Sequence, residues 1–164
     1  MGYIESLRKK IGHDEIIAVG AGVFIYQNGK VLLQRRKDNL CWSMHSGGME
    51  IGETVEETAK RELFEETGLT ANSLELLGVF SGEELRYTYP NGDRACIVEI
   101  LYICRDFAGV LLPEKAEILE LKWFDINNLP KEISPPDRNA FLAFSEYIKR
   151  EELAAGFKKS MEGI

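Results

Sequence analysis

The sequence predicts an α/β domain in which helices pack against a mixed β-sheet. Several short segments carry the apolar and β-branched residues that are typical of strands, whereas two longer segments, in the middle and at the end of the chain, show helical spacing. The chain has 164 residues, of which 45% are apolar, and this suits one domain with its own core. We therefore expect residues 1–164 to form a single layered domain.

The first elements are a short helix and a β-hairpin. Within residues 1–12, apolar residues recur at helical spacing and indicate a short amphipathic segment. Residues 15–37 contain two strand-like runs joined at Asn28-Gly29, which is the favoured signal for a two-residue hairpin. The hairpin supplies two strands of the sheet ahead of the middle helix.

The second half of the chain predicts further strands and a final helix. Residues 74–89 and 95–106 are strand-like and are joined by the turn sequence YPNGDR, and residues 118–126 resemble a further short strand. Residues 138–157 place aromatic and aliphatic residues on one helical stripe, and the two prolines just before them fit a helix start. This succession of strands and helices favours the α/β class.

Composition and charge exclude several classes of function. The formal net charge of -7 argues against binding to a nucleic-acid polymer, which needs a basic surface. No apolar run approaches the ~18 residues of a membrane span. No apolar stretch follows the basic residues of the N-terminus, as it would in a secretory signal. We therefore expect no membrane or nucleic-acid partner, and an anionic ligand would require a bridging cation.

The three cysteines indicate the cellular compartment. Cys41, Cys96 and Cys104 are odd in number and lack CxxC spacing, so we expect neither a disulfide framework nor a zinc site. Free thiols are typical of a reducing compartment. The sequence therefore predicts a cytoplasmic protein.

Residues 47–69 form a segment crowded with glutamates. Thr54 followed by Glu57 is a capping box, and Gly68 stands where a left-handed C-cap would end a helix. Between these ends, the apolar residues fall on one helical stripe. The segment therefore predicts a helix that begins after Thr54 and ends at Gly68.

Three glutamates of this helix, Glu62, Glu65 and Glu66, form an arc that overlaps its apolar side. A solvated charged face is the simplest explanation of a glutamate-rich helix, and it suits the glutamates on the opposite side. It does not suit Glu62 and Glu66, because half-buried like charges four residues apart repel each other unless something neutralises them. Carboxylate oxygens are ligands that Mg²⁺ and Mn²⁺ prefer, so the helix predicts a divalent-cation site.

The spacing of these residues resembles a known family motif. Gly47, five residues, Glu53, seven residues and then the run Arg61–Leu69 match the Nudix box, G-x5-E-x7-R-E-U-x-E-E-x-G-U, at every specified position. The hairpin before the box and the sequence ELKWFDINNLP after it also look like features of this family. The resemblance is weakest over residues 1–12 and 155–164.

The resemblance implies the Nudix fold, an α/β/α sandwich with a mixed β-sheet. It also implies a hydrolase that cleaves a nucleoside diphosphate linked to another group X, such as a nucleoside triphosphate, an oxidised nucleotide or an ADP-ribose-like substrate. Water attacks one phosphorus, and Mg²⁺ or Mn²⁺ is the cofactor. By this resemblance Glu62, Glu65 and Glu66 bind the metal, Arg61 holds Glu62 in place, and Glu53 supports the metal cluster from the loop.

The chain departs from the family pattern just before the box, where His45-Ser46 replaces the usual Pro-Gly. The resemblance gives Ser46 a metal-binding backbone carbonyl, and His45 is either a structural replacement for proline or a phosphate contact. The family also commonly supplies one more carboxylate ahead of the final strand. Among Glu114, Glu117 and Glu120, the spacing favours Glu117 as a metal ligand and general base, with Glu120 as the alternative, unless all three are solvated loop charges.

Nothing in the sequence determines X. Arg35 and Arg36 end the second strand, and one of them is a candidate phosphate contact. Tyr87 and Tyr89 are candidates for stacking on a base, although aromatic residues at strand ends are often core packing. Two other functions stay open, a non-catalytic nucleotide sensor and a prenyl-diphosphate isomerase on the same fold. We expect a small nucleotide as the substrate, and a homodimer stays open.

Overall fold

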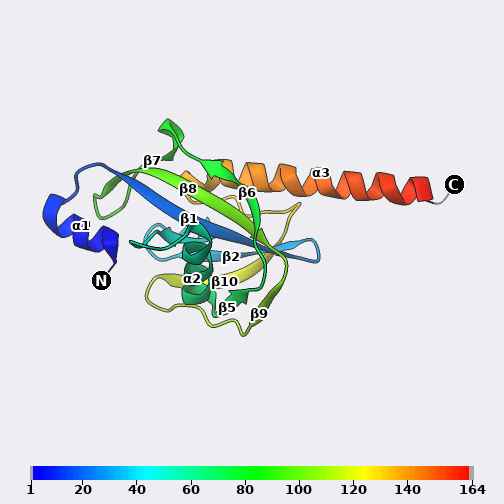
Figure 1. The fold of residues 1–164 in the computed structure, drawn as a ribbon, viewed down its shortest axis with the longest axis horizontal. Coiled ribbons are helices and arrows are strands. Elements are labelled where there is room, and N and C mark those ends of the chain that lie inside the picture. Colours follow the sequence, from blue (N-terminus) through cyan, green and yellow to red (C-terminus); the bar gives the residue numbers. More distant parts are fainter. Residues whose placement is uncertain (1, 163–164) are drawn as a thin grey trace.

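The structure is a computed structural model, and it describes residues 2–162 (Figure 1). Its helices and strands, in chain order, are α1 (Tyr3–Ile11), β1 (Ile16–Gln27), β2 (Lys30–Arg36), β3 (Trp42–Ser43), β4 (His45–Gly48), α2 (Val55–Thr67), β5 (Leu69–Ala71), β6 (Glu75–Phe80), η1 (Glu83–Leu85), β7 (Arg86–Thr88), β8 (Arg94–Cys104), β9 (Phe107–Gly109), β10 (Ile118–Asp125), η2 (Pro135–Asp137) and α3 (Arg138–Glu162). The elements η1 and η2 are short 3₁₀ turns.

A mixed sheet forms the centre of the molecule. Its main strands lie in the order β10-β2-β1-β8-β6, with β3, β4 and β7 paired beside them, and β5 and β9 form a separate two-stranded sheet. Strands β1 and β8 are parallel, whereas the other pairs of the main sheet are antiparallel. The mixed sheet that the sequence predicts is therefore confirmed.

The turn between β1 and β2 has the predicted hairpin geometry. Asn28 and Gly29 both have positive φ, at 52° and 75°, and Gln27 pairs with Lys30 across the turn. A type I′ turn requires positive φ at both central positions, and asparagine and glycine adopt it most readily. The turn fixes the register of β2, whose last residues lie beside the candidate site.

Helices cover both faces of the sheet and complete the α/β/α sandwich (Figure 1). Alternate residues of β1 point to opposite faces, so Val23 packs with Ala59 and Leu63 of α2, whereas Phe24 packs against α3. The ring of Phe24 stacks on that of Phe144, with centroids 4.3 Å apart. The first of these cores holds α2, the helix rich in glutamate, against one face of the sheet, and the second holds α3 against the other face.

The structure corrects one predicted strand and adds four short ones. Residues 74–89 do not form a single strand, because Gly82, with a φ of 111°, turns the chain into η1 between β6 and β7. Strands β3, β4, β5 and β9 have two to four residues each, which is too short for an alternating pattern to appear in the sequence. Their positions depend on pairing with distant strands.

Both ends of the described chain are helical and lie at opposite ends of the molecule (Figure 1). The segment predicted as helical within residues 1–12 is α1, and the final helix extends to Glu162, beyond the predicted end at residue 157. Residues 1, 163 and 164 of the predicted domain lie outside the described residues. Within residues 2–162, no helix is long and apolar enough to cross a membrane.

Candidate active site

Helix α2 begins and ends as predicted. The Thr54 hydroxyl accepts a hydrogen bond from the backbone N–H of Glu57 (3.2 Å), and the Glu57 carboxylate accepts one from the N–H of Thr54 (2.8 Å). Gly68, with a φ of 75°, ends the helix. Before the helix in the chain, β4 pairs with β1 and leads through a short loop into the first residue of α2. Helix α2 and β4 thus lie against each other at the start of the candidate site.

Gly47 of β4 lets the strand approach α2 closely. A Cβ atom at this position would lie 2.1 Å from the carboxyl carbon of Glu62 and 2.3 Å from each of its oxygens. Any side chain would therefore displace the Glu62 carboxylate. This contact explains the first glycine of the 47–69 segment.

Arg61 connects the acidic groups around β4. Its guanidinium donates two hydrogen bonds to Glu53, at 2.6 and 3.0 Å, one to Glu62 at 2.5 Å, and one to the carbonyl oxygen of Gly48 at 2.9 Å. A further contact of 3.2 Å reaches Glu65. A planar group with several donors can satisfy all these acceptors together. The orientation of Glu62 is thus set by Arg61 and by the space at Gly47.

Glu53 is fully engaged in holding Arg61. Besides the two bonds from Arg61, its carboxylate accepts bonds from the Thr58 hydroxyl (2.8 Å) and the N–H of Glu50 (3.0 Å). The Arg61 guanidinium holds the pKa of Glu53 at about 2. Glu53 lies behind Arg61 and is not among the residues that line the cavity described below. Its position fits a role in orienting Arg61.

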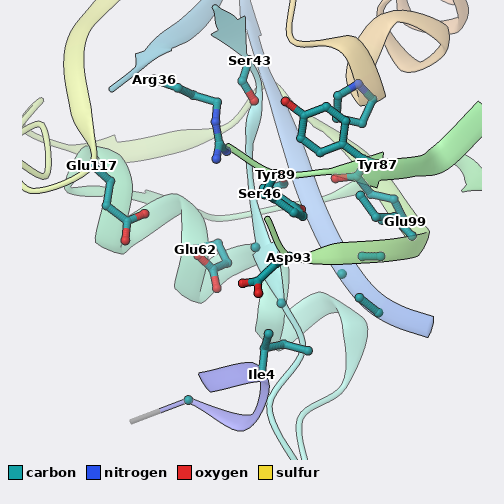
Figure 2. Close-up of a pocket in the computed structure, with 18 of the residues that line it drawn as sticks. Ile4, Arg36, Ser43, Ser46, Glu62, Tyr87, Tyr89, Asp93, Glu99 and Glu117 are labelled. Carbon is teal, nitrogen blue, oxygen red and sulfur yellow. The ribbon is translucent and has the colours of Figure 1, made fainter. Parts of the chain in front are cut away.

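The other glutamates line one cavity of about 670 Å³. Glu62, Glu65 and Glu66 face it from α2, and Glu117 faces it from the loop before β10. Figure 2 shows Glu62 and Glu117 projecting toward this space from two separate elements. Glu120 is exposed on β10 and is not part of the lining. The structure thus brings Glu117, and not Glu120, close to the helix.

Glu114 shapes the loop that carries Glu117. Its carboxylate accepts hydrogen bonds from the backbone N–H groups of Ala116 (2.9 Å) and Glu117 (2.8 Å). The N–H of Lys37 donates to the carbonyl oxygen of Glu117 (2.9 Å) and ties the loop to the end of β2. These bonds occupy the Glu114 carboxylate and leave the side chain of Glu117 directed at the cavity.

The three α2 glutamates differ in exposure. The side chains of Glu62 and Glu66 are each 15% exposed, whereas that of Glu65 is 54% exposed. The predicted arc is therefore half-buried at Glu62 and Glu66 and largely open at Glu65. Burial raises the pKa of Glu62 to about 7; Arg61 opposes this shift, whereas repulsion from Glu66 and Glu65 adds to it. The site favours an additional positive charge.

Glu66 retains one oxygen without a hydrogen bond. Its Oε1 accepts a bond from the Gln34 amide (2.9 Å), while Oε2 is buried and has no hydrogen-bond partner among the described residues. The Nδ1 atom of His45 is 3.4 Å from this Oε2. His45 is fully buried and does not line the cavity, so its position agrees with a structural role and not with a phosphate contact.

The opposite wall of the cavity carries aromatic and polar residues. The rings of Tyr87 and Tyr89 meet edge to face, with centroids 4.9 Å apart, and both line the cavity. Arg36 also lines it and is paired with Asp38 through two hydrogen bonds of 2.9 and 2.7 Å. Arg35 is absent from the lining, and its Nε donates to the carbonyl of Leu40. Successive strand residues point to opposite faces, so only one of the two arginines can face the cavity.

Two buried acids in the same wall were not expected from the sequence. Glu99 of β8 and Asp137 of η2 are 7% and 6% exposed, and both line the cavity. The Ser46 hydroxyl hydrogen-bonds to Glu99, and Oδ2 of Asp137 has no hydrogen-bond partner among the described residues. Burial raises the pKa of both groups. Figure 2 shows Glu99 beside Ser46 in this wall.

The sequence contains a feature from which Glu99, but not Asp137, could have been predicted as a site residue. Glu99 is the single charged residue inside the apolar run ACIVEILYIC, where a carboxylate has no place unless it faces a polar site. Asp137 gave no such signal, because an aspartate after two prolines also looks like an ordinary helix-capping residue.

The comparison with protein families agrees with this geometry. A family model described as the NUDIX domain matches residues 17–144. The chain belongs to the Nudix family. The matched segment contains the hairpin, the loop between β4 and α2, α2 itself and the strands that surround the cavity, whereas α1 precedes it.

Individual Nudix proteins resemble the chain over most of this segment. An ADP-ribose pyrophosphatase of Methanocaldococcus jannaschii is 39% identical over 118 residues, which cover 70% of this chain and 65% of the relative. An oxidized purine nucleoside triphosphate hydrolase of Danio rerio is 30% identical over 111 residues, 66% of each chain. The crystal structure of a MutT NUDIX hydrolase from Burkholderia pseudomallei superposes with a TM-score of 0.67 at 27% identity and covers 79% of this chain and 98% of that one. The chain thus spans slightly less than two thirds of the length of these two curated relatives.

The donor set of this Nudix site fits a divalent cation. Its oxygens are hard ligands, and the unpartnered Oε2 of Glu66 and the crowded, half-buried Glu62 both favour a positive neighbour. In the structure, the positive charge that faces Glu62 and Glu65 is the Arg61 guanidinium. Among the described residues, no three acidic, histidine or cysteine side chains converge into a finished metal site.

The structure gathers most of the predicted site residues of this Nudix chain around one cavity. Those that line it are Ser46, Glu62, Glu65, Glu66, Glu117, Arg36, Tyr87 and Tyr89. Arg61 hydrogen-bonds to Glu62 and orients it, and Glu53 holds Arg61 in turn. Arg35 is the one predicted residue that the structure leaves away from both groups, since its side chain turns to the Leu40 carbonyl.

Proposed function

We propose that the chain is a Mg²⁺- or Mn²⁺-dependent pyrophosphohydrolase that cleaves a nucleoside diphosphate linked to another group X. The observation that carries this proposal is the fixed Glu62 carboxylate, held between Arg61 and Gly47 at the edge of an acidic cavity. The carboxylates of an acidic site repel an anionic diphosphate, so such a substrate binds there only if cations lie between the two. The intact carboxylate set argues against a non-catalytic sensor and against the isomerase.

In this proposal, different residues bind the metal, orient a metal ligand and accept a proton. Glu62, Glu65, Glu66 and Glu117, with the backbone carbonyl of Ser46, would hold the metal. A bound divalent cation neutralises phosphate oxygens, polarises phosphorus and lowers the pKa of bound water. Arg61 keeps Glu62 in its ligating orientation, and Glu117 accepts the proton of the attacking water.

The opposite wall is proposed to bind the nucleoside end. Tyr87 and Tyr89 line this wall and meet edge to face, and a ring face that this contact leaves open would stack on a base. The free Oδ2 of Asp137 is a buried acceptor, suited to an N–H group of a planar ring. Arg36 adds a positive charge near the phosphates, although its pairing with Asp38 weakens that charge. The two curated relatives are named after nucleotide substrates, ADP-ribose and oxidised purine nucleoside triphosphates. These names support a nucleotide as the substrate of this chain.

A substrate panel tests the proposal and identifies X. Nucleoside triphosphates, oxidised dGTP, ADP-ribose, dinucleoside polyphosphates and capped RNA are incubated with the protein and Mg²⁺ or Mn²⁺, and released phosphates and nucleotides are measured. We expect turnover of at least one member, and its products locate the cleaved bond. Binding of a member without any turnover would favour the sensor, and the absence of both would overturn the proposal.

Location and partners follow from the same reasoning. Cys41, Cys96 and Cys104 are free in the structure. We infer a reducing, cytoplasmic location, a small nucleotide as the only substrate class, and no nucleic-acid polymer or membrane as partner. A homodimer stays open, and sedimentation equilibrium of the purified chain tests for it.

A further inference from the structure

Helix α1 forms part of the cavity although it lies outside the segment that the family model matches. Gly2, Ile4, Glu5 and Arg8 line the cavity, whereas the matched segment begins at residue 17. Figure 2 shows Ile4 at one end of the cavity and Arg36 and Ser43 at the other, with Glu62 between them. The wall at the Ile4 end therefore comes from a helix that precedes the segment matched by the family model.

The first turn of α1 sits on the loop between β4 and α2. Both carboxylate oxygens of Glu50 accept a hydrogen bond from the N–H of Tyr3, at 3.0 and 2.9 Å. A Cβ atom on Gly2 would lie 2.6 Å from Oε1 of Glu50, so any side chain at this position must displace the carboxylate that accepts from Tyr3. Ile4 lies against Gly48, where an added Cβ would be 3.4 Å from its Cγ1. The helix is thus seated on the loop that begins the catalytic segment.

The far end of α1 is attached to the turn between β7 and β8. Arg8 donates hydrogen bonds to the carbonyl oxygens of Gly12 (3.2 Å), Asp14 (2.5 Å) and Arg94 (2.8 Å). Its Nε is 3.6 Å from Asp93, a residue of that turn which also lines the cavity. Helix α1 therefore bridges two walls of the cavity.

Helix α1 contributes residues to the lining of the cavity, but none to the two hydrophobic cores. None of its residues is fully buried, and its apolar stripe, Ile4, Leu7 and Ile11, is only partly covered. A nine-residue helix is not stable alone in water and depends on docking. A group bound in the cavity would cover Ile4 and add to the docking contacts.

We propose that α1 is the end wall of the substrate site and restricts X to compact groups, such as a phosphate or a single sugar phosphate. This inference rests on the proposed function. With the phosphates at Glu62 and the base at the wall of Tyr89 and Asp137, X extends toward Ile4 and meets it. A second nucleoside or an RNA chain as X collides with α1, so these substrates are rejected.

The test undocks α1 without changing a residue of the catalytic loop. The double variant Gly2→Val/Arg8→Ala removes the seat on Glu50 and the attachment to Arg94. Kinetics then compare a dinucleoside tetraphosphate with the nucleoside triphosphate of the same base. The kcat/KM for the dinucleoside tetraphosphate is divided by the kcat/KM for the nucleoside triphosphate. We expect this ratio to be ~10-fold or more higher in the double variant than in the wild-type protein. Lys10→Ala, on the exposed side of α1, is the matched control and should leave the ratio unchanged.

A second measurement covers the case in which the double variant does not fold. Amide hydrogen exchange of residues 3–11 is followed in the wild-type protein with Mg²⁺, with and without a methylene-bridged nucleoside triphosphate. We expect slower exchange of α1 with the nucleotide bound. Unchanged exchange, or an unchanged substrate ratio in the folded double variant, overturns the end-wall proposal and leaves the hydrolase intact. A wild-type protein that hydrolyses no member of the panel overturns both.

Discussion

The direction of the Glu62 carboxylate depends on two neighbours that act in different ways. Gly47 provides space, since any side chain there would overlap the carboxylate, and Arg61 provides a hydrogen bond and a charge. Arg61 is in turn held by Glu53, which accepts from it through both oxygens. Single-residue changes in this group should therefore alter catalysis far more than stability.

Replacing Arg61 with lysine tests this orientation. Lysine keeps the charge but cannot bond Glu53, Glu62 and the Gly48 carbonyl together, because it lacks the planar fork. We expect Arg61→Lys to lower kcat by ~10-fold or more while the unfolding temperature changes little. Steady-state kinetics and thermal unfolding measure the two effects, with Lys60→Ala on the exposed side of α2 as control. A variant with the wild-type rate would reduce Arg61 to a surface ion pair.

The candidate general base is tested by a pair of similar changes. Glu117 lines the cavity, whereas Glu120 is exposed on β10. We expect Glu117→Gln to lower kcat by ~10-fold or more, or to flatten the acidic limb of the pH–rate profile. Glu120→Gln should have a much smaller effect. If the two variants behave in the reverse order, the assignment moves to Glu120.

At the scale of elements, local signals were sufficient for some parts of the fold and not for others. The hairpin turn at Asn28-Gly29 and the ends of α2 follow from short-range chemistry, so the sequence predicts them closely. Strands β3 and β4 consist of so few residues that only their partners β2 and β1 define them. Asp137 reaches the cavity because the segment just before η2 is hydrogen-bonded to Trp42 of β3, a contact that no local pattern indicates.

The same distinction applies to the candidate site. The box residues could be placed because their spacing is that of one helix and one loop, which fixes their relative positions. The choice between Arg35 and Arg36 could not be made, since it depends on which face of β2 the cavity occupies. The approach of α1 to Glu50 also escaped prediction, because it joins residues from separate elements through a backbone N–H.

Helix α3 offers an element-scale prediction about stability. Phe144 is fully buried and stacks on Phe24, whereas Leu142 of the same helix is 64% exposed. We expect Phe144→Ala to lower the free energy of unfolding by about 3–5 kcal/mol. Leu142→Ala should change it by about 0.5 kcal/mol or less. Urea unfolding followed by circular dichroism measures both, and equal losses would mean that α3 does not dock through this stripe.

For the whole molecule, the net charge of -7 and the acidic cavity make metal binding and stability interdependent. Excess chelator should abolish turnover, and Mg²⁺ or Mn²⁺ should restore it. The cation should also raise the unfolding temperature by mass action, because it relieves repulsion between Glu62 and Glu66. Glu66→Gln should lose most of this thermal shift, whereas Glu56→Gln, at an exposed residue that does not line the cavity, should keep it. Full activity in excess chelator would refute the metal requirement.

The parallel pairing of β1 with β8 has a consequence for how the protein is made. Ile16 pairs with Ala95 and Ile25 with Cys104. In the sequence, the loop between β4 and α2 and the helix α2 itself therefore lie between strands β1 and β8. A ribosome therefore releases β1 and the glutamates of α2 well before β8 emerges to complete the sheet. Contacts between residues so far apart form late and slowly. During synthesis, the acidic helix remains without its opposing wall until β8 has left the exit tunnel, and the catalytic cavity is among the last parts of the molecule to form.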